Sequence, residues 1–102
     1  MHNEKFKIKL NKSELDALYN VLELVTTMKP KQMNTKVYVA EMLELYKKVL
    51  LKWTCPKEKN TVTMTLPQAL SFYILFNSYI NMNIHTHVTV RVICDAIHKQ
   101  YV

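Results

Sequence analysis

Two segments of the sequence alternate strictly between apolar and polar residues, and they limit the folds open to the chain. The segments are residues 5–10 (KFKIKL) and 61–66 (TVTMTL). A period of two predicts half-buried β-strands. Because two strands are only marginally stable by themselves, we expect them to pair antiparallel as a ribbon, with helices over one face. That inward face holds Phe6, Ile8, Leu10, Val62, Met64 and Leu66.

Helical periodicity follows each predicted strand. Asn11 with Glu14 three residues later predicts a capped helix start, and this first helix should end near Lys29-Pro30. Thr35 is expected to cap a second helix that extends to Trp53. Within it, one side carries Val39, Met42, Leu43, Tyr46, Val49, Leu50 and Trp53.

The second strand is followed by the same succession. Pro67 suits the first turn of a third helix, and a fourth is expected from about Thr86 or Thr89, after a loop over residues 81–85. An offset near 55 residues relates the two parts of the chain. It pairs Leu15 with Leu70, Leu18 with Tyr73 and Tyr19 with Ile74.

The chain is therefore expected to form an α+β, mostly helical fold of four helices and one antiparallel ribbon. At 102 residues it has the length of a single domain, residues 1–102. This domain divides into two strand-helix-helix halves, residues 5–53 and 61–102. The polar, Pro-containing stretch 54–60 is expected to link them.

Composition excludes some functions and leaves others open. The chain has no Gly, so the Gly-rich loops that bind nucleotide phosphates are excluded. A net charge of +6 is compatible with an acidic partner such as nucleic acid. The two cysteines, Cys55 and Cys94, form no paired framework, and no signal peptide or membrane span is evident. We therefore expect a cytoplasmic protein that does not contact a membrane.

The outward face of the ribbon is the first candidate site. A two-stranded ribbon fits the major groove of DNA, where Lys donates to guanine or phosphate and Thr contacts bases through its hydroxyl or methyl group. The alternative is that the lysines only guard the strands against edge pairing and that Thr is present as a good strand former. This predicted face consists of Lys5, Lys7, Lys9, Thr61, Thr63 and Thr65.

KFKIKLNKSELDAL followed by NTKVYVAEMLELYKK resembles a ribbon-helix-helix repressor unit, and TVTMTLPQAL with HTHVTVRVICDAIHKQY resembles a second copy. The resemblance covers nearly the whole chain as a tandem unit. It implies that the ribbon reads bases in the major groove while the starts of the second helices meet the DNA backbone. The resemblance thus assigns phosphate contacts to Asn34, Thr35, Thr86 and His87, and implies a transcriptional regulator.

The competing hypothesis is a protein–protein interaction module or homodimeric adaptor, with Phe72, Phe76 and Trp53 as interface residues. Salt would then affect binding little, whereas DNA binding should depend on Lys5, Lys7 and Lys9 more than on Lys47 and Lys48.

Catalytic and metal-binding patterns are weak. The acidic residues are scattered beside lysines, so we expect neither an enzyme nor a small-molecule substrate. Cys94 and His98 have the spacing of two metal ligands, as do His85 and His87. Cys94, however, lies on the predicted core stripe, so no metal or other cofactor is expected.

Overall fold

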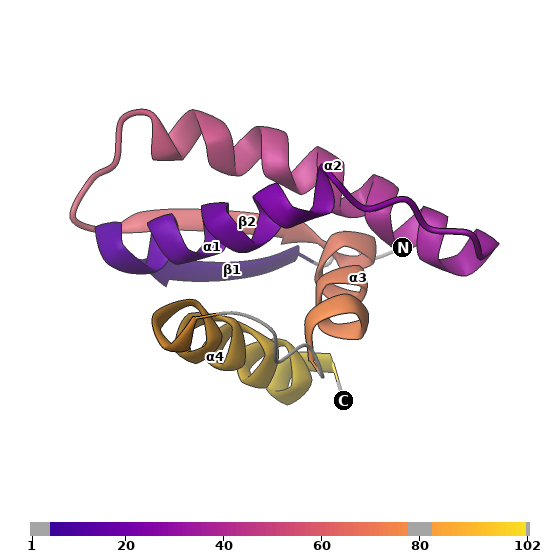
Figure 1. Ribbon diagram of the computed structural model, residues 1–102. Coiled ribbons are helices and arrows are strands. Elements are labelled where there is room, and N and C mark those ends of the chain that lie inside the picture. Colours follow the sequence, from indigo (N-terminus) through magenta and orange to yellow (C-terminus); the bar gives the residue numbers. More distant parts are fainter. Residues whose placement is uncertain (1–4, 78–82, 102) are drawn as a thin grey trace.

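The computed structural model describes residues 5–77 and 83–101 of the chain (Figure 1). Within these residues it confirms the expected α+β, mostly helical class, with one two-stranded antiparallel sheet and four helices. No helix in these two ranges is long and apolar enough to cross a membrane. The elements are β1 (Lys5–Leu10), α1 (Lys12–Val25), α2 (Met33–Trp53), β2 (Asn60–Thr65), α3 (Leu66–Phe76) and α4 (Ile84–Tyr101).

The ribbon has the predicted pairing and the predicted faces. Phe6 lies opposite Met64, and Ile8 lies opposite Val62. Phe6, Val62 and Met64 are buried and Ile8 is half-buried, as the alternation predicts. The second strand is shifted by one residue relative to the prediction. It runs from Asn60 to Thr65, and Leu66 already belongs to α3.

Two capping boxes begin the helices that follow the strands. At α1 the Asn11 side chain accepts from the Glu14 N–H at 2.8 Å, and the Glu14 carboxylate accepts from the Asn11 N–H at 2.9 Å. At α3 the Thr65 hydroxyl accepts from the Gln68 N–H at 3.2 Å, and the Gln68 side chain accepts from the Thr65 N–H at 3.0 Å. The first box and Pro67 in the first turn of α3 confirm the sequence prediction.

Three helix boundaries differ from the prediction. Helix α1 ends at Val25 instead of near Lys29-Pro30, with the hydroxyls of Thr26 and Thr27 donating to the carbonyls of Glu23 and Leu24. Helix α2 begins at Met33 after the N-cap Gln32, so Thr35 does not cap it. Helix α4 begins at Ile84, because the Asn83 side chain accepts from the Thr86 N–H at 2.8 Å and so caps the helix earlier. Residues 81–82 of the predicted loop lie outside the described residues.

The helices of the two halves interleave around one core. Helix α1 packs against α2 and α4, and α3 packs against α4 and α2 (Figure 1). The largest fully buried side chains come from both strands and all four helices. They are Phe72, Phe76, Leu10, Leu15, Leu18, Leu22, Met42, Leu45, Met64, Ile93, Ile97 and Val21.

Burial corrects the face assigned to α2 and shows which side of α3 faces the core. Leu45 of α2 is fully buried, although it was not on the predicted side, whereas Leu43 is only half-buried. In α3 the exposed fractions of Leu70 and Ile74 are 37% and 54%, while Phe72 is fully buried. At an offset of 55 residues, two of the three predicted pairs therefore match a buried side chain of α1 with an exposed one of α3: Leu15 with Leu70, and Tyr19 with Ile74.

An offset of 54 residues superimposes the start of α1 on the start of α3. It places the capping box of Asn11 and Glu14 on that of Thr65 and Gln68. Both Leu18 and Phe72, its counterpart at this offset, are fully buried.

Candidate nucleic-acid interface

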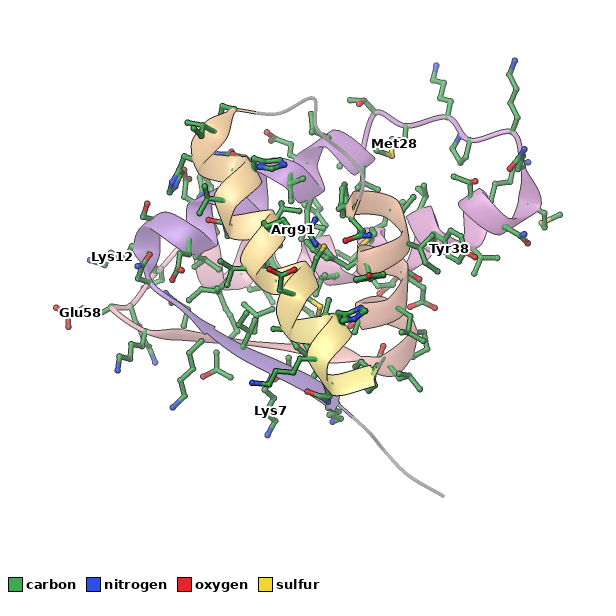
Figure 2. The ribbon with its side chains drawn as sticks, turned by 90° about the horizontal axis from the view of Figure 1, so that it is seen from below. Lys7, Lys12, Met28, Tyr38, Glu58 and Arg91 are labelled. Atoms are coloured by element: carbon green, nitrogen blue, oxygen red, sulfur yellow. The ribbon has the colours of Figure 1, made fainter. Side chains whose placement is uncertain are left out.

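The predicted outward residues lie on one face of the ribbon, in register. Lys5 is paired with Thr65, Lys7 with Thr63 and Lys9 with Thr61. The three lysines and Thr61 are exposed. Figure 2 shows the Lys7 side chain pointing away from the helices. The ribbon therefore separates an apolar face, which completes the core, from a polar face that carries cations.

The three threonines of this face differ in their surroundings. Thr63 is half-buried, and its carbonyl oxygen lies 3.5 Å from Lys48 Nζ. Thr65 is also half-buried, and its hydroxyl oxygen is occupied as the cap of α3. Thr65 thus has a structural role at the end of the strand, and its assignment as a base contact stays a prediction.

No lysine of the ribbon face forms an ion pair with another described residue, although Lys9 lines a hollow together with Glu14 and Glu58. Among the residues that the structure describes, ion pairs join Lys47 with Glu44 at 3.4 Å and Arg91 with Asp95 at 3.0 Å. None involves a lysine of β1. The positive charge of the face is therefore available to a partner.

The predicted phosphate contacts are not equivalent. The Thr86 side chain is buried, with an exposed fraction of 4%, so its assignment as a phosphate contact is wrong. His87 is half-buried, and the first turn of α4 packs against the start of α1, where His85 Nε2 lies 2.9 Å from Ser13 Oγ. Asn34 is exposed and Thr35 is half-buried, both in the first turn of α2.

The aromatic residues proposed as an interface lie mostly inside the molecule. Phe72 and Phe76 have exposed fractions of 0% and 1%, and their ring centroids are 4.9 Å apart. They belong to the core of this chain, which corrects their assignment as surface anchors. Trp53 is partly exposed at 36% and stacks on Tyr19 with ring centroids 4.0 Å apart. Its indole nitrogen donates to Asp16 at 2.9 Å, so Trp53 fastens the end of α2 to α1.

Tyr19 joins this aromatic stack to a second ring. Its hydroxyl lies 3.4 Å from that of Tyr46 and donates to Glu23 at 3.4 Å. The hydrogen bond with Tyr46, together with burial and the charge of Glu23, raises the pKa of Tyr19 to about 12. Tyr19 therefore stays neutral and holds α1 against α2.

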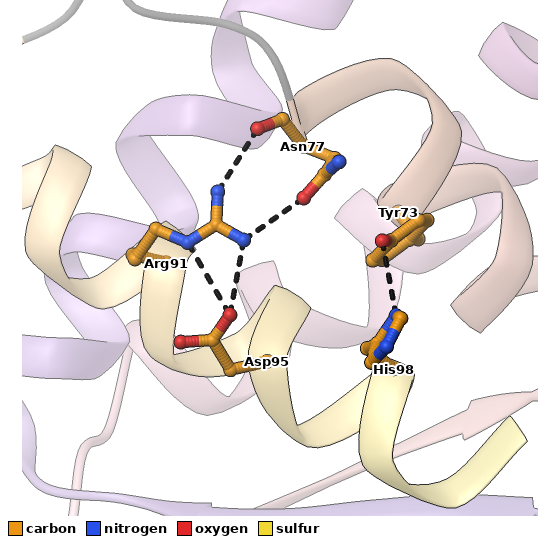
Figure 3. Close-up of polar contacts among 5 residues, drawn as sticks. All are labelled: Tyr73, Asn77, Arg91, Asp95 and His98. Atoms are coloured by element: carbon orange, nitrogen blue, oxygen red, sulfur yellow. Dashed lines mark hydrogen bonds and ion pairs between the residues drawn. The ribbon is translucent and has the colours of Figure 1, made fainter. Parts of the chain in front are cut away.

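The residues with metal-ligand spacing have other partners. His98 Nδ1 lies 3.2 Å from the Tyr73 hydroxyl, and Arg91 donates to the Asn77 carbonyl and side chain at 3.0 and 2.9 Å (Figure 3). Cys94 is buried, and burial raises the pKa of its thiol to about 11. In residues 5–77 and 83–101, no three His, Cys, Asp or Glu side chains gather as a metal site would require. The contacts of His98 with Tyr73 and of Arg91 with Asn77 join α4 to α3.

Two surface features are not evident from the sequence. Ile84, Val88 and Val92 form an apolar stripe on α4, with exposed fractions of 83%, 55% and 46%. Their spacing of four residues was the available signal, but it was indistinguishable from core periodicity. The second feature is a groove of about 530 Å³ between β2 and α2, lined in part by Lys48 and Lys52. Only the packing of α2 beside β2 creates this groove.

No protein-family model, curated protein or solved structure matches this chain. Its function is therefore argued from its own residues.

Proposed function

We propose that the protein binds duplex DNA by placing its ribbon in the major groove and acts as a transcriptional regulator, as the ribbon-helix-helix repressors that its sequence resembles do. The observation that carries the proposal is the register of β1 and β2, which aligns three exposed lysines opposite threonines on the face away from the core. None of these lysines is ion-paired with another residue that the structure describes.

The dimensions of the ribbon suit this partner. The major groove is about 12 Å wide, and paired strands lie about 4.8 Å apart, so a two-stranded ribbon enters it with its side chains on the base edges. Lys7 and Lys9 would donate to guanine or to phosphate, and Thr61 would contact bases through its hydroxyl or methyl group.

An approximate twofold arrangement supports the same proposal. At an offset of 54 residues Ile8 corresponds to Val62, and these two residues are paired with each other at the middle of the ribbon. We infer that the halves are related by a pseudo-twofold axis through this pair. Lys7 and Lys9 then correspond to Thr61 and Thr63, so the DNA half-sites read by the two halves would differ in sequence.

The test is fluorescence anisotropy of a labelled mixed-sequence duplex titrated with protein at 50 and 200 mM salt. We expect a dissociation constant in or below the range of about 10⁻⁴ to 10⁻⁶ M at 50 mM salt, weakening at least tenfold at 200 mM, because binding releases counterions from the duplex. The triple variant Lys5→Gln, Lys7→Gln, Lys9→Gln should lose this binding while keeping its fold.

The matched control is Lys31→Gln, Lys36→Gln, Lys47→Gln, which removes the same charge from exposed positions outside the ribbon. It should bind much more tightly than the ribbon variant. Absence of duplex binding by the wild-type protein at 50 mM salt would refute DNA binding, and equal losses in both triple variants would refute the ribbon as its site.

A second candidate function is protein–protein interaction, which the exposed stripe of Ile84, Val88 and Val92 favours. This stripe replaces Phe72 and Phe76 as the apolar surface of that hypothesis. Absence of duplex binding, together with self-association that resists salt in sedimentation velocity, would select this second function.

A further inference from the structure

The groove between β2 and α2, here called the β2–α2 groove, continues the ribbon face around the edge of the sheet. It has a volume of about 530 Å³ and shares Lys5, Thr61 and Thr63 with the ribbon face. On the helix side it is lined by Lys48 and Lys52. A second hollow of about 210 Å³ shares Lys52 and Thr61 with the groove and adds two further lysines, Lys57 and Lys59.

This path is positively charged along its whole length. Five lysines line the two hollows, and no Asp or Glu does. None of the five is ion-paired with another residue in the described part of the chain. In contrast, the adjacent Lys47 is paired with Glu44 on the exposed side of α2. The charge of α2 is therefore left unneutralised on the side that lies beside the ribbon.

Lys48 is fixed in the groove before any ligand arrives. Its ammonium donates to Gln68 Oε1 at 3.0 Å and lies 3.5 Å from the carbonyl oxygen of Thr63. Gln68 is itself held by the capping box of α3. Because the side chain is already ordered, Lys48 loses less conformational entropy when it binds an anion.

From this arrangement we infer that the β2–α2 groove holds the sugar–phosphate backbone of one strand of the bound duplex. This inference rests on the proposed function. When a ribbon about 5 Å wide lies in a groove about 12 Å wide, the DNA backbones run beside its outer edges. The outer edge of β2 is where Lys48 and Lys52 lie.

The number of the cations fits a polyanion better than a single phosphate, because five lysines line two adjoining hollows. Lys48 and Lys52 are one helical turn apart, about 6 Å along α2. The line continues to Lys57 and Lys59 in the next hollow. Lysine acts as a point charge towards phosphate, so these contacts should add affinity without sequence preference.

The test compares two double variants of α2 in the duplex titration. Lys48→Gln, Lys52→Gln removes the helix side of the groove, and Lys36→Gln, Lys47→Gln removes the same charge from exposed positions of the same helix. We expect the groove variant to lower the salt-dependence slope by about 2 and to weaken binding at least tenfold at 50 mM salt, equally for duplexes of different sequence. The control should keep the wild-type slope.

A lysine-acetylation footprint provides a direct readout. Saturating duplex should reduce the acetylation of Lys48 and Lys52, measured by mass spectrometry, and leave Lys36 and Lys47 unchanged. Protection of Lys48 and Lys52 by phosphatidylserine vesicles but not by duplex would overturn the inference in favour of a membrane surface.

The failures of the two proposals are distinguishable. If the wild-type protein binds duplex and the ribbon variant does not, while the groove variant keeps the wild-type slope, then only the groove inference is wrong. If the wild-type protein does not bind duplex at 50 mM salt, both are wrong.

Discussion

Lys47 and Lys48 are adjacent in the sequence, yet they face different surroundings. Lys47 is exposed and paired with Glu44, whereas Lys48 donates to Gln68 beside the second strand. The sequence predicts that both matter less for DNA binding than the lysines of β1. The groove inference reverses this expectation for Lys48 alone, because only its ammonium lies next to the ribbon.

Cys94 makes the stability of the fold depend on pH. Burial raises the pKa of its thiol from 9.0 to about 11. Between these values the unfolded chain loses the proton more readily than the folded one, so the free energy of unfolding falls as pH rises above about 9. We expect urea denaturation to show a larger fall between pH 8 and 10 for the wild-type protein than for Cys94→Ala. Equal falls in both proteins would contradict this account.

The ends of the ribbon depend on side chains that satisfy backbone groups. Asn60, the first residue of β2, is 5% exposed. Its side-chain nitrogen Nδ2 donates to the backbone carbonyls of Leu10 and Lys57 at 3.1 and 2.8 Å. Its side-chain oxygen Oδ1 accepts from the Lys57 N–H at 2.9 Å. The sequence placed Asn60 in the linker, because the role of a buried polar residue depends on the partners that the fold brings to it.

Replacing Asn60 should therefore destabilise the sheet. Asn60→Ala leaves the two carbonyls without this donor, so we expect the free energy of unfolding to fall by about 2 to 3 kcal/mol in urea titrations. Thr61→Ala, at the exposed neighbouring position, is the control and should change it by no more than about 1 kcal/mol, the span of strand propensity. A similar small change for both variants would show that water replaces the Asn60 contacts.

The start of α1 was easier to predict than its end. Asn11 with Glu14 is a local pattern, and it forms the expected capping box because both partners lie within one turn. The end of α1 at Val25 has no such signal: Lys29-Pro30 sets only the latest residue at which the helix could stop. The hydroxyls of Thr26 and Thr27 bond to the last turn and end the helix earlier.

The interleaving of the two halves decides which side chains form the core. Phe72 is fully buried, and the helix that carries it packs against both α2 and α4. Ile74, two residues later on the same helix, is 54% exposed. Helical periodicity alone allowed either side of α3 to face inward, because both sides carry apolar residues.

The consequence is a sharp difference between two substitutions in α3. Phe72→Ala should lower the free energy of unfolding by about 3 to 5 kcal/mol, because it leaves a cavity in the shared core. Ile74→Ala should lower it by less than about 1 kcal/mol. Urea denaturation measures both changes in the free energy of unfolding, and sedimentation velocity measures the oligomeric state of each variant. A Phe72→Ala variant that keeps its stability but changes its oligomeric state would return Phe72 to an interface role.

The two strands, to within one residue, their inward and outward faces and the first cap are evident from the sequence. These features depend on contacts within a few residues, and a period of two places Lys5, Lys7 and Lys9 on one side wherever the strand lies. Tertiary structure alone decided the buried side of α3, the burial of Thr86 and the groove that Lys48 and Lys52 share with the ribbon. These depend on which elements pack together, and packing is set by the shapes of distant surfaces rather than by local spacing.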